Sequence, residues 1–177
     1  YREAAIRAVE HLGGLGKKRI AFLGTTKEGV GSTGFTREIY SGYKAGLANT
    51  SLPYPQELVH SFADVTEPYS WGMEMAEELL ALKPDAIYCL NDHIAFGVLA
   101  ALRKRGILVP GEIAVVGNDD FKAAKFVDPP LTSVDMMLED CGVLAGKQLL
   151  SMLDGVKPQQ PLYGPVKVKS RASTLGF

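Results

Sequence analysis

Acid and amide side chains stand in pairs directly after two apolar segments. Asp119 and Asp120 follow the segment that starts at residue 113, and Asn91 and Asp92 follow residues 86–90. If both segments are parallel strands, their carboxyl ends border the crevice where open α/β sheets bind ligands. Carboxylates and amides there could hold a metal, serve as acid and base, or accept hydrogen bonds from a polyhydroxylated ligand. In each pair we expect one side chain to cap the next turn and its neighbour to face the crevice.

A glycine-rich stretch covers residues 24–34, and its part 29–34, GVGSTG, matches the G-x-G-x-x-G pattern of dinucleotide-binding proteins. That pattern needs its glycines at the end of a strand, so that the pyrophosphate meets the following helix. Here Gly29 comes five positions after Gly24, and no acidic residue ends the next apolar segment at the expected distance. No lysine follows these glycines as in a P-loop. We interpret the stretch as a glycine loop rather than a phosphate site.

The remaining reactive side chains form no catalytic set. His11, His60 and His93 lack metal-ligand spacing with cysteine or aspartate, and no G-x-S-x-G nucleophile elbow occurs. Cys89 and Cys141 lie far apart in apolar settings, a pattern typical of buried free thiols in a reducing compartment. The sequence therefore predicts a protein that is not an enzyme, with no metal site and no cofactor.

Around these residues, apolar segments and helical spacing alternate at intervals of roughly 30 residues, which is typical of βαβ units. After residue 117 the alternation stops, and residues 118–130 have an irregular pattern. The predicted fold class is α/β, an open and mainly parallel sheet with helices on both faces. The expected strands are 19–23, 57–62, 86–90, 113–116, 131–134 and 166–169; the expected helices are 2–15, 36–48, 70–82, 92–105 and 138–153.

Size and composition narrow the function classes. The chain has 177 residues, enough for one domain, with 46% hydrophobic and 22% charged residues. Its net charge is −1, and its short basic runs are too small for the patch that nucleic-acid binding requires, so this chain alone should not hold DNA. No signal peptide opens it and no apolar run could span a bilayer, so we expect a cytoplasmic protein.

Six segments, in order and spanning nearly the whole chain, resemble LacI/GalR-type bacterial transcription regulators. Compared with isolated motifs such as the glycine pattern, six segments in the right order are a specific signal. They are AIRAVEHLGGLGKKRIAFLG (5–24), Arg37 with SGYKAGL (41–47), PDAI through LND and AFG (84–97), VPGEIAVVGNDD (109–120), PPLTSV (129–134) and SRAST (170–174).

The resemblance implies a type I periplasmic-binding-protein-like fold, in which two α/β subdomains clamp a small molecule. By that comparison, residues 1–134 and 163–177 form the C-terminal subdomain. Residues 135–162 are a crossover helix and connection that belong to the N-terminal subdomain. By the same comparison, we expect the first part of that subdomain and the helix-turn-helix headpiece to be missing from these residues. We therefore expect the chain to bind effector at least tenfold more weakly than the full-length protein, and to reach operator DNA only through the headpiece.

The resemblance also implies site residues. Arg37, Asn91 and Asp119 stand where the family contacts its effector, and Phe62 or Tyr69 could stack on it. Asn118 replaces the usual aromatic residue before the aspartates. Arginine, amide and carboxylate groups together suit a sugar or sugar derivative, the expected effector.

Family members form dimers, so we expect a homodimer with apolar surface from helices 92–105 and 71–82. Trp71 and Met75 are candidates for this contact, although packing against the sheet is an equal alternative for both.

Two other functions stay open. An extracytoplasmic sugar-binding protein has the same fold, and an enzyme could use a nucleotide on a doubly wound sheet. PPLTSV and RAST favour the regulator over the former, and the lack of a phosphate loop disfavours the latter.

Overall fold

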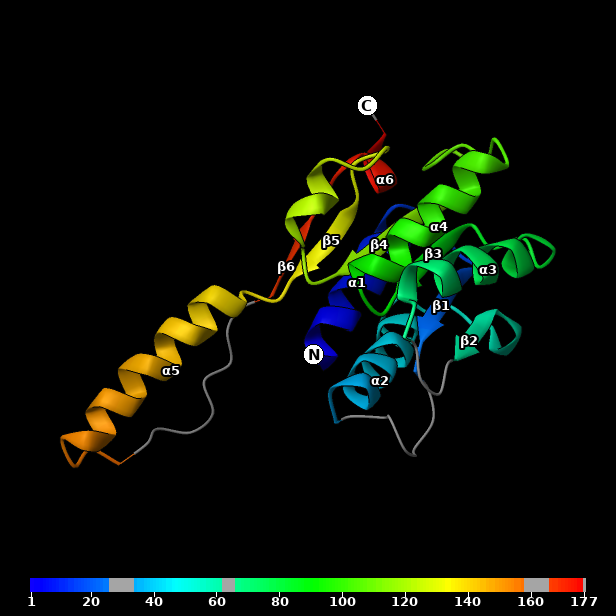
Figure 1. The fold of residues 1–177 in the computed structure, drawn as a ribbon. Helices are drawn as coiled ribbons and strands as arrows, with labels where there is room; N and C mark the ends of the chain where they lie inside the picture. The colour runs from blue at the N-terminus through cyan, green and yellow to red at the C-terminus, as the bar shows by residue number, and fades with distance from the viewer. Residues whose placement is uncertain (26–33, 62–65, 158–165, 177) are drawn as a thin grey trace.

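Six strands form a single sheet in the order β2-β1-β3-β4-β5-β6, in which only the β5–β6 pair is antiparallel. The computed structural model describes residues 1–25, 34–61, 66–157 and 166–176 (Figure 1). The strands are β1 (Ile20–Gly24), β2 (Val59–Ser61), β3 (Ala86–Cys89), β4 (Ala114–Asn118), β5 (Thr132–Asp135) and β6 (Lys167–Lys169).

Helices cover both faces of this sheet. One pair packs on the face that carries Phe22 and Tyr88, and the other pair packs on the opposite face (Figure 1). The first pair is α1 (Arg2–Gly14) and α2 (Gly34–Asn49), and the second is α3 (Pro68–Leu80) and α4 (Asp92–Lys104). Short helices η1 (Gln56–Leu58), η2 (Lys122–Lys125) and α6 (Ala172–Leu175) complete the body. The predicted α/β class is confirmed.

The central strands are apolar because the helices bury both of their faces. Every residue of β1, β3 and β4 is buried. On the face covered by α1 and α2, the ring of Phe22 stacks on that of Tyr43 at 5.1 Å between centroids. The Tyr43 hydroxyl donates to the carbonyl of Ile20 at 2.8 Å. Parallel strands of this kind are predicted well by continuous apolar runs.

Two glycines set the close approach of α3 to α4. A Cβ atom at Gly97 would collide with the backbone carbonyl oxygen of Tyr69, and one at Gly72 would collide with the carbonyl oxygen of Ile94. Both obstacles are backbone atoms, so a larger residue can be accommodated only if the helices separate. This contact fixes the N-terminal turn of α4, and with it the position of Asn91.

We expect Gly97→Ala to lower the free energy of unfolding by about 1–3 kcal/mol, the usual cost of overpacking. Gly146→Ala is the matched control, because Gly146 is also inside a helix and nothing lies within 4 Å of its added Cβ. Alanine is the better helix former, so the control should not lower stability. Urea unfolding followed by circular dichroism measures both variants. Equal stability of the two would contradict the close packing of α3 on α4.

The remaining helix, α5 (Leu138–Leu153), lies away from the rest of the molecule (Figure 1). None of its residues is buried, although it is amphipathic and carries several large apolar side chains. Those that are exposed are Leu138, Val143, Leu144, Leu149, Leu150, Met152 and Leu153. Among the described helices, none is long and apolar enough to cross a bilayer.

The predicted elements agree with the structure to within a few residues, with three differences. Strand β2 is shorter than the predicted 57–62, because η1 occupies residues up to Leu58. The segment 118–130, predicted to be irregular, contains η2, and α6 follows the last strand without having been predicted. Most of the glycine stretch, residues 26–33, lies outside the described residues.

Candidate functional site

Three predicted site residues, Arg37, Asn91 and Asp119, belong to elements that begin or end at the same edge of the sheet. Asp119 directly follows β4, and Asn91 comes two residues after the end of β3. These strands are adjacent and parallel, so both residues lie at the carboxyl ends. Arg37 is exposed in the first turn of α2, the helix that comes after β1 and runs back from the same edge. Of these three residues, Asp119 alone lines the hollow described below. Whether the three bind one ligand stays a prediction.

One side chain of the Asn91–Asp92 pair caps a helix as predicted, but the other is buried rather than facing the crevice. Asn91 is the cap of α4, since its Oδ1 accepts the backbone N–H of Ile94 at 3.0 Å. Asp92, however, does not face the crevice. It is fully buried and accepts the Ser133 hydroxyl at 2.6 Å and the backbone N–H of Phe121 at 2.7 Å. Asp92 therefore joins the start of α4 to β5 and to the loop after β4.

The Asp119–Asp120 pair is divided as predicted into one engaged and one available carboxylate, but the engaged one is not a cap. Asp120 forms an ion pair with Arg171 at 2.6 Å, with both side chains largely covered. The Asp119 side chain has no hydrogen bond or ion pair to the described residues, while its backbone N–H donates to the carbonyl of Val134 at 2.9 Å. Asp119 has φ of 104°, a left-handed conformation that is rare outside glycine, asparagine and aspartate.

Burial makes Asp119 and Asp92 weaker acids than exposed carboxyls. Burial, followed by the nearby charge of Asp92, raises the pKa of Asp119 to about 7. Burial also raises the pKa of Asp92 to about 6, although its hydrogen bonds from Ser133 and Phe121 oppose the shift. Strained backbone and a perturbed, unpartnered carboxyl are features that gather at functional sites. Asp119 is thus the best-supported ligand contact on this edge.

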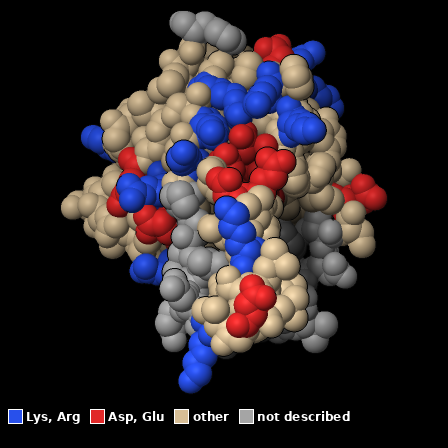
Figure 2. Space-filling view, turned by 90° about the vertical axis from the view of Figure 1, so that its left-hand side faces the viewer, with Lys and Arg blue, Asp and Glu red and all other residues tan. Residues whose placement is uncertain are grey.

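Asp119 borders a hollow of about 340 Å³ between the end of β4 and the start of α5. Figure 2 looks at the side that carries α5, where acidic side chains gather in a patch with lysines and arginines around it. No three of the described acidic, histidine or cysteine side chains are arranged to hold a metal ion. The lining residues are Asp119, Asp120, Lys122, Asp135, Met137, Leu138, Glu139 and Asp140.

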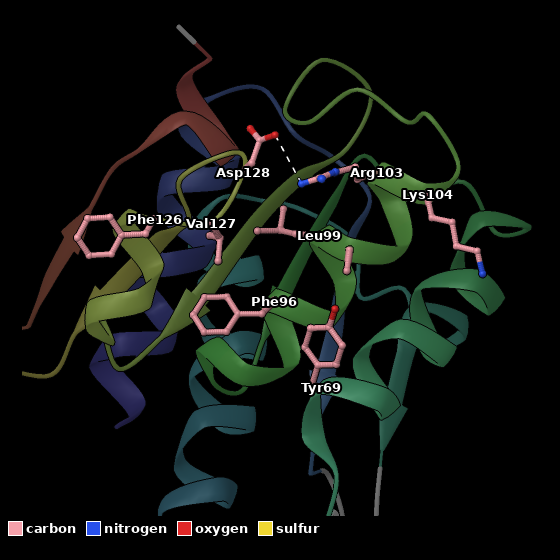
Figure 3. Close-up of a pocket in the computed structure, with 9 residues that line it drawn as sticks. Tyr69, Phe96, Leu99, Arg103, Lys104, Phe126, Val127 and Asp128 are labelled. Carbon is pink, nitrogen blue, oxygen red and sulfur yellow. Dashed lines mark ion pairs between the residues drawn. The ribbon is translucent and has the colours of Figure 1, made fainter.

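Of the two aromatic candidates, Tyr69 does not line this hollow. Phe62 lies outside the described residues. Tyr69 is 45% exposed on α3 and lines a different groove of about 610 Å³, which runs along the outer face of α4 (Figure 3). Neither Asn91 nor Asp119 lines that groove. This placement argues against the stacking role predicted for Tyr69.

The groove contains an apolar residue that the sequence analysis missed. Phe126 follows η2 and is 84% exposed, the highest value among the large apolar side chains. Phe96 and Val127 lie near it in the groove, and an exposed ion pair of 3.7 Å joins Arg103 to Asp128 at one end (Figure 3). Phe126 lies in a segment without helical or strand periodicity, so the sequence pattern did not indicate that this side chain would be exposed. We call the surface formed by Tyr69, Phe96 and Phe126 the α4 groove.

Trp71 and Met75, predicted as possible dimer contacts, are both partly buried and packed against the core. Their position agrees with the alternative that they pack inward.

The chain is similar to a known domain family and to characterised proteins. The family model for a periplasmic binding protein-like domain matches residues 9–174. The transcriptional repressor PurR of Actinobacillus pleuropneumoniae is 31% identical over 169 residues, which cover 94% of this chain and 47% of that protein. The chain thus spans about half the length of the curated relatives it matches.

Solved structures give the same result. A sugar-binding transcriptional regulator of the LacI family from Escherichia coli, complexed with phosphate, has a TM-score of 0.85 and 29% identity. The match covers 99% of this chain and 61% of that one. A transcriptional regulator CelR in complex with cellobiose has a TM-score of 0.81 and 29% identity, over 97% of this chain and 51% of that one.

Proposed function

The chain belongs to the LacI/GalR family of transcriptional regulators through its periplasmic binding protein-like domain, and on this premise we propose that it senses a sugar effector. Asp119 carries the proposal, because it is a half-buried carboxylate at the carboxyl end of a central strand and has no partner among the described residues. We assign the effector contacts to Arg37, Asn91 and Asp119. A regulator rather than an enzyme fits this set, which binds hydroxyl groups without a nucleophile.

Each side chain offers a hydrogen bond suited to a sugar. The Asp119 carboxylate accepts from hydroxyl groups and the Arg37 guanidinium donates to them. Asn91 uses its Oδ1 for the helix cap, which leaves its amide N–H groups to donate. One relative holds cellobiose, a neutral disaccharide, in the corresponding fold.

Calorimetric titration against cellobiose, lactose, glucose, galactose, xylose and gluconate tests the proposal. We expect at least one saturable sugar complex that weakens in an Asp119→Asn variant. If no sugar in the panel binds, or if the Asp119→Asn variant binds as tightly as the wild-type chain, the proposed function is wrong.

We also propose that the chain works within a longer regulator. The bare apolar face of α5 and the greater length of the relatives support this arrangement. In it, residues 1–134 and 163–177 form one lobe, and 135–162 pack in a second lobe across the effector. Operator DNA is contacted by a separate headpiece, and the protein acts in the cytoplasm, where its operator lies.

We further propose a homodimer formed through the α4 groove. Two exposed aromatic side chains, Phe126 and Tyr69, and the partly buried Phe96 line this groove, and apolar surface of this kind is typical of protein interfaces. Phe126→Glu should place a charge in the contact and raise the dimer dissociation constant at least tenfold. Leu175→Glu is the control, since Leu175 is 56% exposed but outside the groove. Sedimentation equilibrium measures both. A monomeric wild-type chain at high concentration, or equal effects of the two variants, would count against this interface.

A further inference from the structure

Two fully buried polar side chains near Asp119 have no hydrogen-bond partner. The hydroxyl of Tyr88, on β3, and both polar atoms of the Asn118 carboxamide, at the end of β4, are unpaired in the part of the chain that the structure describes. Most buried polar atoms in proteins are paired, so such groups need a specific explanation.

Tyr88 and Asn118 are neighbours on one face of the sheet. Tyr88 pairs in register with Val116, and Asn118 lies two residues further along β4, on the same side. A diagonal neighbour at this separation is within reach of a tyrosine ring. The charge of Asp119 is one of the causes that raise the pKa of Tyr88, after burial, which places the phenol near that carboxylate.

Packing alone does not explain these residue types. Phenylalanine at position 88 or leucine at 118 would fill similar volumes without burying an unpaired polar atom. The same sheet face can satisfy a tyrosine, because the Tyr43 hydroxyl donates to the Ile20 carbonyl at 2.8 Å. The ring of Tyr88 packs beside that of Phe22, at 5.7 Å between centroids. The apolar part of the side chain is therefore well packed, whereas the hydroxyl lacks a hydrogen bond among the described residues.

We propose that Tyr88 and Asn118 are specificity-determining residues of the effector site, and that they gain their hydrogen bonds from hydroxyl groups of the bound sugar. The inference rests on the proposed function, in which Asp119 holds a sugar at this edge. A phenol and a carboxamide both donate and accept, which matches a neutral hydroxyl group. A phosphate or carboxylate offers only acceptors and would leave the Asn118 carbonyl unpaired. The favoured effector is therefore an uncharged sugar.

Both groups are covered in the structure, so binding has to open this end of the sheet. The hydrogen bonds gained with the sugar offset part of the cost of that opening. Sugar affinity therefore depends on the hydrogen bonds of these two polar groups. The same groups contribute nothing to the stability of the ligand-free fold.

Tyr88→Phe and Asn118→Leu test the inference, because each removes the polar atoms at similar volume. Each should weaken binding of the best sugar in the panel above about fivefold to tenfold, the loss of one neutral hydrogen bond. Neither should lower the melting temperature of the ligand-free chain. Tyr43→Phe is the matched control: it leaves the Ile20 carbonyl unpaired, so it should lower the melting temperature by several degrees and leave affinity unchanged.

Three results would overturn the inference. If Asp119→Asn weakens binding but Tyr88→Phe and Asn118→Leu do not, the site stands and the role of these two residues fails. If either variant melts as early as Tyr43→Phe without sugar, its polar group has a structural partner and the inference fails whatever the affinities are. If no sugar binds the wild-type chain, or Asp119→Asn binds as wild type does, the proposed function fails and the inference fails with it.

Discussion

Asp119→Asn is expected to weaken sugar binding about 30-fold or more. A carboxylate that accepts two hydroxyl groups forms two charge-assisted hydrogen bonds, each about 1 kcal/mol stronger than its neutral counterpart. Losing about 2 kcal/mol corresponds to a factor of about 30 in the dissociation constant. Asparagine tolerates the left-handed backbone at this position, so the fold should survive the change. Calorimetry of the wild-type and variant chains measures the ratio.

Asp120→Asn is the matched control, because Asp120 is the adjacent carboxylate and also has a left-handed backbone, with φ of 50°. Its partner is Arg171 at 2.6 Å, so the change should lower thermal stability while leaving affinity within about twofold. If the two variants lose affinity equally, the assignment of Asp119 rather than its neighbour to the effector is wrong.

Proton uptake by Asp119 adds a pH dependence to the same experiment. Its pKa of about 7 means that protons compete with sugar hydroxyl groups for the carboxylate near neutral pH. Affinity should rise as the pH increases through 7 and level off above about 8, with a slope of at most tenfold per pH unit. The Asp119→Asn variant should lose this slope. A wild-type affinity that stays flat from pH 5.5 to 8.5 would show that the carboxylate does not accept from the ligand.

The same raised pKa values affect the ligand-free fold with the opposite sign. Asp92, with a pKa of about 6, and Asp119 bind protons more tightly in the folded than in the unfolded chain. The contributions of both groups to stability therefore decrease as the pH rises from about 4 to 7. The two residues weaken the fold at the pH where Asp119 is ready to bind sugar.

The sequence was sufficient to predict the sheet because its signals are local. Buried parallel strands require continuous apolar runs, and a polar residue at the end of such a run has to lie at the sheet edge. The presence of a cap in the Asn91–Asp92 pair follows from that logic, although which of the two side chains forms it was left open. Strand β6 was found as an extended segment, but its antiparallel pairing with β5 depends on a partner more than 30 residues away.

The errors concern residues whose partners are distant in sequence. One of Asn91 and Asp92 was predicted to cap the helix and the other to face the crevice. Asn91 is the cap, but Asp92 is buried and accepts the hydroxyl of Ser133, which is 41 positions away. Helix α6 has four residues and is fixed by contacts such as the bond from the Ser173 hydroxyl to the carbonyl of Val115. The missing partners of Tyr88 and Asn118 are likewise visible only after folding. Local spacing carries no information about any of these contacts.

In the longer regulator proposed above, sugar affinity is expected to be at least tenfold higher than in residues 1–177 alone. The hollow beside Asp119 is bordered by the start of α5, and no residue of that helix is buried in the described structure. Ligand pockets typically bury about 70–90% of a ligand, so a sugar held by one lobe keeps much of its surface in water. A second wall adds hydrogen bonds of about 1 kcal/mol each and excludes solvent from those already formed.

The exposed apolar face of α5 is the part of this chain that we expect to pack in the second lobe, which forms the other wall of the sugar site. If α5 packs in the second lobe, Leu149→Glu should reduce the affinity of the longer protein, because the charge would disrupt the packing that positions that wall. The same change in residues 1–177 should leave sugar affinity unaltered, since Leu149 is solvent-exposed there. Titration of both forms, with and without Leu149→Glu, gives four affinities. Equal values for the two unaltered forms would place the whole site within these residues, and the argument for two lobes would then fail.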